Sequence, residues 1–211
     1  MSGALVQALP GFAGDFVVAL GTNLALAGQA LALGLPAGMA LGLARQPPPE
    51  PTTRERPWPR LLGGAERGAN AIVALLRAAP TFVVMYVLLN TLPAGWGVSP
   101  PRAVAAALAI YATAYVADTL LATIVDRRAG ARDGTALFLM GLARLYVIMV
   151  MSSGFGAAVG VTEATTVTMR ALERLPLLHD RLCLIAGVVA VFVAIRASVY
   201  AAIGAAYRRL Q

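Results

Sequence analysis

The chain has 211 residues, of which 59% are hydrophobic and 13% charged, with a mean hydropathy of +0.74. So little polar surface cannot cover a soluble globule, which excludes that class and predicts an all-α integral membrane protein. All 17 basic residues are Arg and the net charge is +7, an excess that membrane topology explains better than nucleic-acid binding. The single Cys183 excludes an internal disulfide, and no spacing of Cys and His predicts a metal site.

Apolar stretches predict about five transmembrane helices within a single domain of residues 1–211. We expect these helices at residues 16–43, 71–92, 103–125, 135–161 and 182–207. The first exceeds the roughly 20 residues that a bilayer requires, so it is tilted, kinked near Pro36, or extended beyond the membrane. It carries glycines that would let neighbouring backbones approach closely, namely Gly21, Gly28, Gly34, Gly38 and Gly42.

The first stretch has no basic residue before Phe16, so we expect it to stay in the mature protein instead of being cleaved as a signal peptide. A proline-rich linker follows at residues 44–68. Because of its prolines, we expect residues 46–60 to be extended and not helical, with a proline-docking role as an open alternative. Later, residues 163–181 form the longest outer segment, and its first part has helical spacing.

The distribution of arginine predicts the orientation, because positively charged short loops stay in the cytoplasm. Ten arginines fall on the side of the first connection, the third connection and the C-terminal tail: Arg45, Arg54, Arg56, Arg60, Arg67, Arg127, Arg128, Arg132, Arg208 and Arg209. The other side carries four, which are Arg102, Arg170, Arg174 and Arg181. We therefore expect the N-terminus outside and the C-terminus in the cytoplasm.

Polar side chains inside the apolar stretches are candidates for a substrate path, because a charge at the membrane centre costs about 3 kcal/mol and must face protein or water. The candidates are Arg77, Asp118, Arg144, Ser152 and Ser153. Each has a structural alternative. Arg77 can extend to the headgroups, Asp118 can pair with Arg77 or Arg144, and the serines can serve helix packing. We expect Arg196 to be structural.

Nothing in the sequence predicts an enzyme. No stretch has the glycine-rich pattern with Lys and Ser or Thr that cradles nucleotide phosphates, so the chain should not bind or hydrolyse ATP and no cofactor is expected. No nucleophile lies beside a base, and no carboxylate pair is visible. His179 has no second His or Ser near it in sequence and is expected at the surface.

Several motifs recur in one order along the apolar stretches. Arg77 and Pro80 open the second stretch, Ala114-Tyr115 precedes Asp118 in the third, and Val159-Gly160-Val161-Thr162-Glu163 closes the fourth. In this order and spacing the chain resembles the permease subunits of polar amino-acid ABC importers from residue 16 to residue 209. The resemblance implies a type I importer fold with five spans. It also implies helix-packing roles for Pro80, Tyr115, Gly154, Gly156 and Gly160.

The chain departs from that family at particular positions. Leu121 stands where the family has an Arg, Arg144 where it has an Asn, and residues 151–155 where it has Lys-Asp-Thr-Ser-Leu. At Arg144 a guanidinium would bind a substrate carboxylate or plug the path. The family also carries a cytoplasmic Glu-Ala-Ala helix that docks on the ATPase, and about ten residues, 125–134, are too few to form it.

The resemblance implies a divergent permease subunit of an amino-acid importer in the bacterial inner membrane. Its expected partners are an intact second permease, an ATP-binding cassette ATPase, an extracytoplasmic solute-binding protein and membrane lipid, with no nucleic acid. The alternative is a permease-derived scaffold or accessory subunit of another membrane complex without transport activity.

Overall fold

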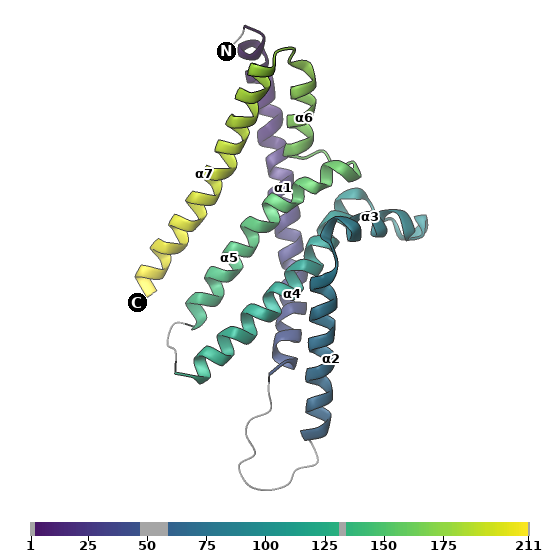
Figure 1. The fold of residues 1–211 in the computed structure, drawn as a ribbon, viewed down its shortest axis with the longest axis vertical. Coiled ribbons are helices and arrows are strands. Elements are labelled where there is room, and N and C mark those ends of the chain that lie inside the picture. The colour runs from purple at the N-terminus through teal and green to yellow at the C-terminus, as the bar shows by residue number, and fades with distance from the viewer. Residues whose placement is uncertain (1–2, 47–58, 131–133, 211) are drawn as a thin grey trace.

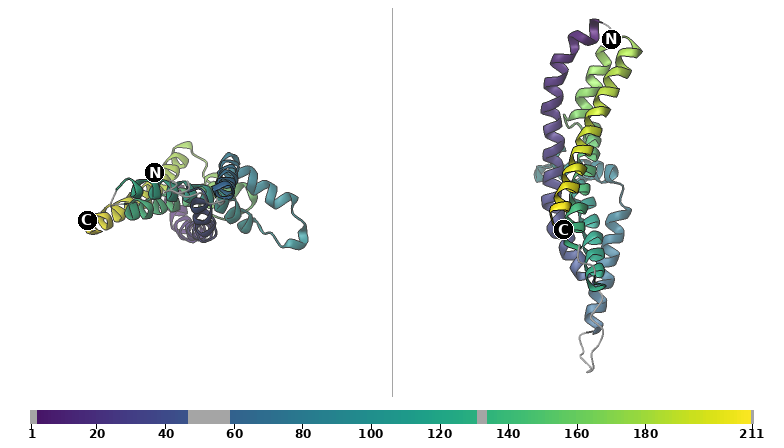
Figure 2. Two further views of the ribbon diagram at one scale, coloured as in Figure 1. Left: turned by 90° about the horizontal axis from the view of Figure 1, so that it is seen from below. Right: turned by 90° about the vertical axis from the view of Figure 1, so that its left-hand side faces the viewer.

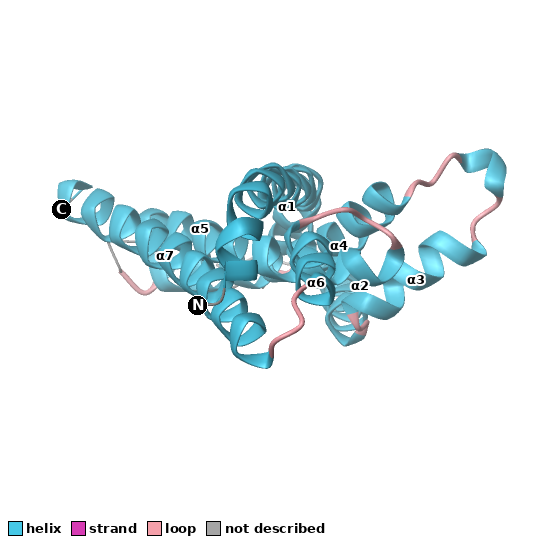
Figure 3. Ribbon diagram, turned by 90° about the horizontal axis from the view of Figure 1, so that it is seen from above, coloured by secondary structure: helices cyan, strands magenta, loops and turns pink. Residues whose placement is uncertain are grey.

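The structure is a computed structural model that describes residues 3–46, 59–130 and 134–210. Within these ranges the chain is helical and contains no strand (Figure 3). In chain order the elements are α1 (Gly3–Ala44), α2 (Pro59–Ala78), α3 (Thr81–Thr91), the 3-10 turn η1 (Ala94–Trp96), α4 (Pro100–Arg128), α5 (Gly134–Ser152), the 3-10 segment η2 (Ser153–Val159), α6 (Ala164–Arg174) and α7 (Leu178–Leu210).

Four of the described helices, α1, α4, α5 with η2, and α7, are long and apolar enough to cross a membrane. The bent pair of α2 and α3 raises this number to five if the pair forms one span. The expectation of an all-α protein with about five apolar spans is therefore confirmed.

The helices form an elongated bundle with α1 on one side of the others (Figure 2). The N-terminus and α6 lie at one end and the start of α2 at the other (Figure 1). We call these the α6 end and the α2 end. The C-terminus points toward the α2 end. In the views along the bundle, α3 and the last turns of α7 project to opposite sides (Figures 2 and 3).

Helix α1 runs through Pro10 and Pro36 as one helix of 42 residues. At 1.5 Å per residue it is about 63 Å long, about twice the ~30 Å hydrocarbon core of a bilayer. Of the alternatives open from the sequence, an unbroken helix that tilts or extends beyond the membrane agrees with this length.

Glycines bring α1 against α4 along most of its second half. A Cβ added to Gly34 would lie 2.6 Å from Ala112 Cβ, and one added to Gly38 would lie 2.6 Å from Val116 Cβ. A Cβ added to Gly42 would lie 3.0 Å from Ala117 O, whereas one added to Gly21 or Gly28 would meet nothing within 4 Å. Three of the five glycines thus permit the close approach, and the other two face open space.

The main core gathers small and branched side chains of α1, α4 and α5 around that contact. Ala27, Ala30, Ala112, Leu145 and Met149 are all fully buried in it. Tyr115 is half-buried, packs against this cluster and has its ring 6.4 Å from that of Tyr111.

The second stretch differs from its expected form. Instead of one helix over residues 71–92, α2 and α3 meet at a 90° bend, with Pro80 preceding the first residue of α3. Proline lacks a backbone N–H and disfavours helical geometry in the residue before it, so the helix ends there. Pro80 therefore acts as a helix breaker.

The linker is also shorter than expected. Helix α2 begins at Pro59, so residues 59–68 are helical. The expectation that residues 46–60 are extended is therefore wrong for residues 59 and 60. Proline is tolerated in the first helical turn, where its missing N–H has no partner in any case. Residues 47–58 lie outside the described part of the chain.

Helix α6 covers Ala164–Arg174, within the stretch of the outer segment where helical spacing was expected. Helix α7 differs from the other long helices, because only 6% of its most apolar window is buried within this chain. It packs against α5 and α6 (Figure 1), and the ring of its Phe192 lies 6.3 Å from that of Phe16 in α1. Most of its surface is left to lipid or to another protein.

Replacing Gly38 by Ala should loosen the contact between α1 and α4, because the added Cβ would overlap Val116 Cβ at 2.6 Å and Thr113 O at 2.7 Å. Overpacking of this kind costs about 1–3 kcal/mol, so the thermal midpoint of the solubilised protein should fall. Gly28→Ala, which meets no atom within 4 Å, is the control and should leave the midpoint unchanged or raised. Equal midpoints for the two variants would contradict the close contact.

Candidate functional site

A cluster of charged and polar side chains joins α1, α2 and α4 toward the α2 end. Arg45, just beyond α1, donates from Nη1 to Asp118 Oδ1 of α4 at 2.6 Å and from Nε to Asn70 Oδ1 of α2 at 2.7 Å. Arg77 of α2 donates from Nη2 to the other carboxylate oxygen, Asp118 Oδ2. We call Arg45, Asn70, Arg77 and Asp118 the Asp118 cluster.

The Asp118 cluster favours the ion-pair alternative for two of the candidate path residues. Asp118 pairs with Arg77, as the sequence allowed, and also with Arg45, which the sequence placed in a connection; Arg144 is not among its partners. Arg45 is well shielded, with 13% of its side chain exposed, whereas 61% of Arg77 is exposed. Two guanidinium groups share one carboxylate, so the cluster keeps a net charge of one positive unit.

A second polar network lies at the junction of α1, η2 and α6. Glu163 is fully buried, and Asn23 Nδ2 of α1 donates to Glu163 Oε2 at 2.9 Å and to Ser153 Oγ at 2.8 Å. Ser153 Oγ in turn donates to Val150 O. The amide oxygen of Asn23 accepts from Ala164 N at 3.0 Å, so both ends of this side chain are used.

The carboxylate of Glu163 caps the N-terminus of α6. Its Oε2 accepts from Thr165 N and its Oε1 from Thr166 N, both at 2.9 Å. Backbone N–H groups at a helix start, together with the helix dipole, stabilise a negative charge there. We call Asn23, Ser153, Glu163 and these backbone groups the Glu163 network.

Glycines permit the tight geometry of this network. A Cβ on Gly154 would lie 2.7 Å from Thr165 Oγ1, and one on Gly156 would lie 3.2 Å from Val161 Cβ. Gly160 has open space around it but a φ of +87°, a conformation that side chains with a Cβ rarely adopt. Gly154 and Gly156 therefore leave little room for a Cβ, whereas Gly160 is needed for its backbone conformation.

The remaining candidates lie elsewhere. Ser152 is half-buried and has no side-chain hydrogen bond within the described residues. Arg144 of α5 lines a cavity of about 480 Å³ between α5 and α7. Arg196 of α7 lines the same cavity, with its guanidinium 5.4 Å from the centre of the Tyr200 ring. The five path candidates therefore fall into separate places instead of a single site.

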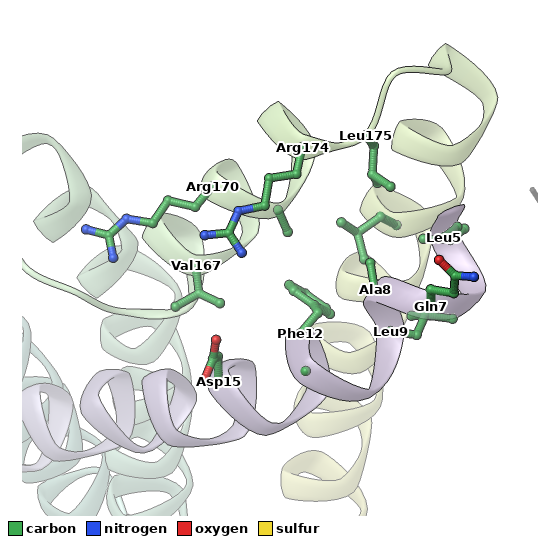
Figure 4. Close-up of a pocket in the computed structure, with 13 residues that line it drawn as sticks. Leu5, Gln7, Ala8, Leu9, Phe12, Asp15, Val167, Arg170, Arg174 and Leu175 are labelled. Atoms are coloured by element: carbon green, nitrogen blue, oxygen red, sulfur yellow. The ribbon is translucent and has the colours of Figure 1, made fainter. Parts of the chain in front are cut away.

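A further pocket of about 360 Å³ lies at the α6 end, between the first turns of α1, α6 and the start of α7. Figure 4 shows Arg170 and Arg174 of α6 above it, with Asp15 of α1 and the Phe12 ring below. The charges of these side chains suit a polar ligand or headgroup as well as water. Among the described residues, no group of His, Cys, Asp and Glu could hold a metal ion.

Several long apolar helices with buried polar networks between them define a multi-pass membrane protein. In structure the chain is similar to a crystal structure of an amino acid ABC transporter with histidines. The TM-score is 0.72 at 17% sequence identity, over 96% of this chain and 97% of that chain. This protein therefore has an ABC permease-like fold. No protein-family model and no curated protein matches its sequence.

Sequence reasoning missed three residues of these sites. Asn23 is one of the few polar residues in the first apolar stretch, and the amide there is the signal that could have found it. Arg45 was assigned to a connection because it directly follows that stretch. Arg196 was expected to be structural, yet it shares a cavity with Arg144, which only the packing of α5 beside α7 could reveal.

Replacing Glu163 by Gln should destabilise the protein. The amide has only one acceptor oxygen, so one of the donors now bound to Oε1 and Oε2 would face an NH₂ group. A buried donor without a partner costs about 1–3 kcal/mol, which thermal unfolding of the solubilised protein will detect. The exposed Glu173 of the same helix provides the control Glu173→Gln, and equal midpoints for the two variants would exclude a stabilising network.

Replacing Asp118 by Asn should leave both Arg45 and Arg77 without a counter-charge and loosen α2 from α1 and α4. Hydrogen bonds to charged groups contribute about 1.5–3 kcal/mol, and the exposure of Arg77 places the expected loss at the lower end. The measurement is cleavage of the intact protein by a protease, which should become faster in α2. Asp126→Asn, at an exposed position of the same helix, should leave the cleavage rate unchanged; a rate for Asp118→Asn equal to the wild type would refute the role.

Proposed function

We propose that this chain is a divergent permease subunit of an ABC-type amino-acid importer. The observation that carries the proposal is the likeness to an amino acid ABC transporter over nearly the whole of both chains. The order of the motifs around Arg77, Asp118 and Glu163 supports it independently. In this proposal the chain is embedded in the bacterial inner membrane and does not itself hydrolyse ATP.

The arginine distribution supports an orientation with the α2 end in the cytoplasm. The ends of α1 and α4 and the starts of α2 and α5 lie toward that end, and the sequence that joins these helices is rich in arginine. Arg170 and Arg174 of α6 lie at the other end. In this orientation the α6 end would meet a solute-binding protein outside the cell.

The connection between α4 and α5 supports a heteromeric assembly. Helix α4 ends at Arg128 and α5 begins at Gly134, so only residues 129–133 separate them. That length is too short for a turn and a helix that would dock on an ATPase. A second, intact permease subunit would provide this contact, and both permeases would bind a separate ATPase and a solute-binding protein.

Two observations favour the alternative, a scaffold or accessory subunit without transport. One is the same short connection. The other is the ion pairing of Asp118, which ties a polar candidate into the structure of the bundle. In this alternative the permease-like fold is retained for its surface instead of a solute path.

Gentle purification of the chain from its native membrane distinguishes the two. An importer subunit should copurify with a second permease and an ATPase, both identifiable by mass spectrometry, and the assembly in proteoliposomes should take up amino acids when ATP is supplied. Copurification with an unrelated membrane complex, without an ATPase, would support the scaffold. A solubilised, unrelated multi-pass protein from the same membrane is the control for nonspecific carry-over.

A further inference from the structure

Two arginines, one from α5 and one from α7, line the same cavity in the groove between these helices. Arg144 lies near the middle of α5 and Arg196 near the middle of α7, and both line the cavity of about 480 Å³. The rest of its lining is Val147, Ile148, Met151 and Tyr200. Two positive charges from separate helices therefore share one hollow with mostly apolar walls.

Neither guanidinium is neutralised within the described part of the chain. The ion pairs found there belong to Arg45 and Arg77, and the contact of Arg196 is with the Tyr200 ring. Both helices are apolar enough to span a membrane, and an unpaired charge in such a segment faces protein, water or a bound ion instead of lipid tails. The cavity thus lacks a negative partner.

The charge is confined to this part of the groove. A second cavity lies between the same helices, near the start of α5 and the end of α7. It is almost entirely apolar. Its lining is Ala136, Leu139, Met140, Ile203, Ala206 and Tyr207. The lining of this second cavity contains no arginine, whereas that of the first contains two.

We propose that the Arg144–Arg196 cavity binds the two carboxylates of an acidic amino acid, which makes this class the transported substrate. The inference rests on the proposed importer function. Each guanidinium can bind one carboxylate through two parallel hydrogen bonds, and the apolar walls suit the methylene groups between the carboxylates. Both arginines are exposed, so an acidic amino acid could reach the hollow from the surface of the chain.

The test measures binding of L-glutamate and L-glutamine to the full chain, purified with its bound partners into nanodiscs of neutral lipid. Glutamine is the matched probe because it replaces the second carboxylate with an amide. Glutamate should bind at least tenfold more tightly than glutamine. Arg144→Gln and Arg196→Gln should each remove most of that difference.

Variants with lysine keep the charge but lose the two-pronged hydrogen bonding, so Arg144→Lys and Arg196→Lys should bind glutamate with intermediate affinity. If the glutamine variants do not fold, these lysine variants still test the proposal. Arg102→Gln is the control, because this exposed arginine bonds to Gly97 O outside the cavity and should leave both affinities unchanged.

Equal affinities for the two probes, or glutamate binding that is the same in both glutamine variants, would overturn the proposal. Nanodiscs with phosphatidylglycerol test the other source of an anionic group. If that lipid abolishes glutamate binding in the wild type, the cavity holds a headgroup and the substrate assignment fails.

Uptake measurements separate this inference from the proposed function. Amino-acid uptake that is insensitive to both arginine substitutions would overturn the inference and leave the importer function standing. Arginine-dependent glutamate binding in a chain that copurifies with no ATPase would overturn the importer function and leave an acidic-ligand site.

Discussion

The contact between α1 and α4 is the constraint on which the rest of the bundle depends. Gly34 and Gly38 place the two backbones so close that even a methyl group would overlap α4. Because α1 is one continuous helix, this contact also sets where its polar residues lie. Asn23 reaches the Glu163 network on one side of it, and Arg45 reaches Asp118 on the other. Small residues thus position the polar side chains at both ends.

The charged groups of the bundle fall into two kinds. Glu163 and Asp118 have partners inside the chain, since amides and backbone N–H groups surround the first and two guanidinium groups bind the second. Such paired groups join helices, and Glu163 does so where it is fully buried. Arg144 and Arg196 have no negative partner in the described residues. In an apolar segment, a charged group with a partner in the chain maintains the fold, whereas a charged group without one is available to a ligand.

The fold class and most helix positions could be predicted from the sequence, because apolar length is a local property. The break at Pro80 was less accessible, since Pro80 lies inside an apolar stretch that is continuous in hydropathy and only its geometry ends the helix. The start of α2 at Pro59 does not follow from the rule that proline disfavours helix, since the first helical turn tolerates proline. For the site, the pairing of Asp118 with Arg77 was one of two stated alternatives, and the added pairing with Arg45 depends on how α1 ends beside α2.

By itself, the sequence determined the membrane class, the helical character, the approximate spans and the short connection between α4 and α5, because composition and chain length decide these properties. The tertiary structure alone decided which polar residues meet. Asn23 and Glu163 are 140 positions apart, and Arg144 and Arg196 belong to helices separated by η2 and α6. Spacing along one helix predicts which side chains share a face of that helix, but not which face another helix covers. Here the close packing of α1 on α4 at glycine helps to set which faces meet.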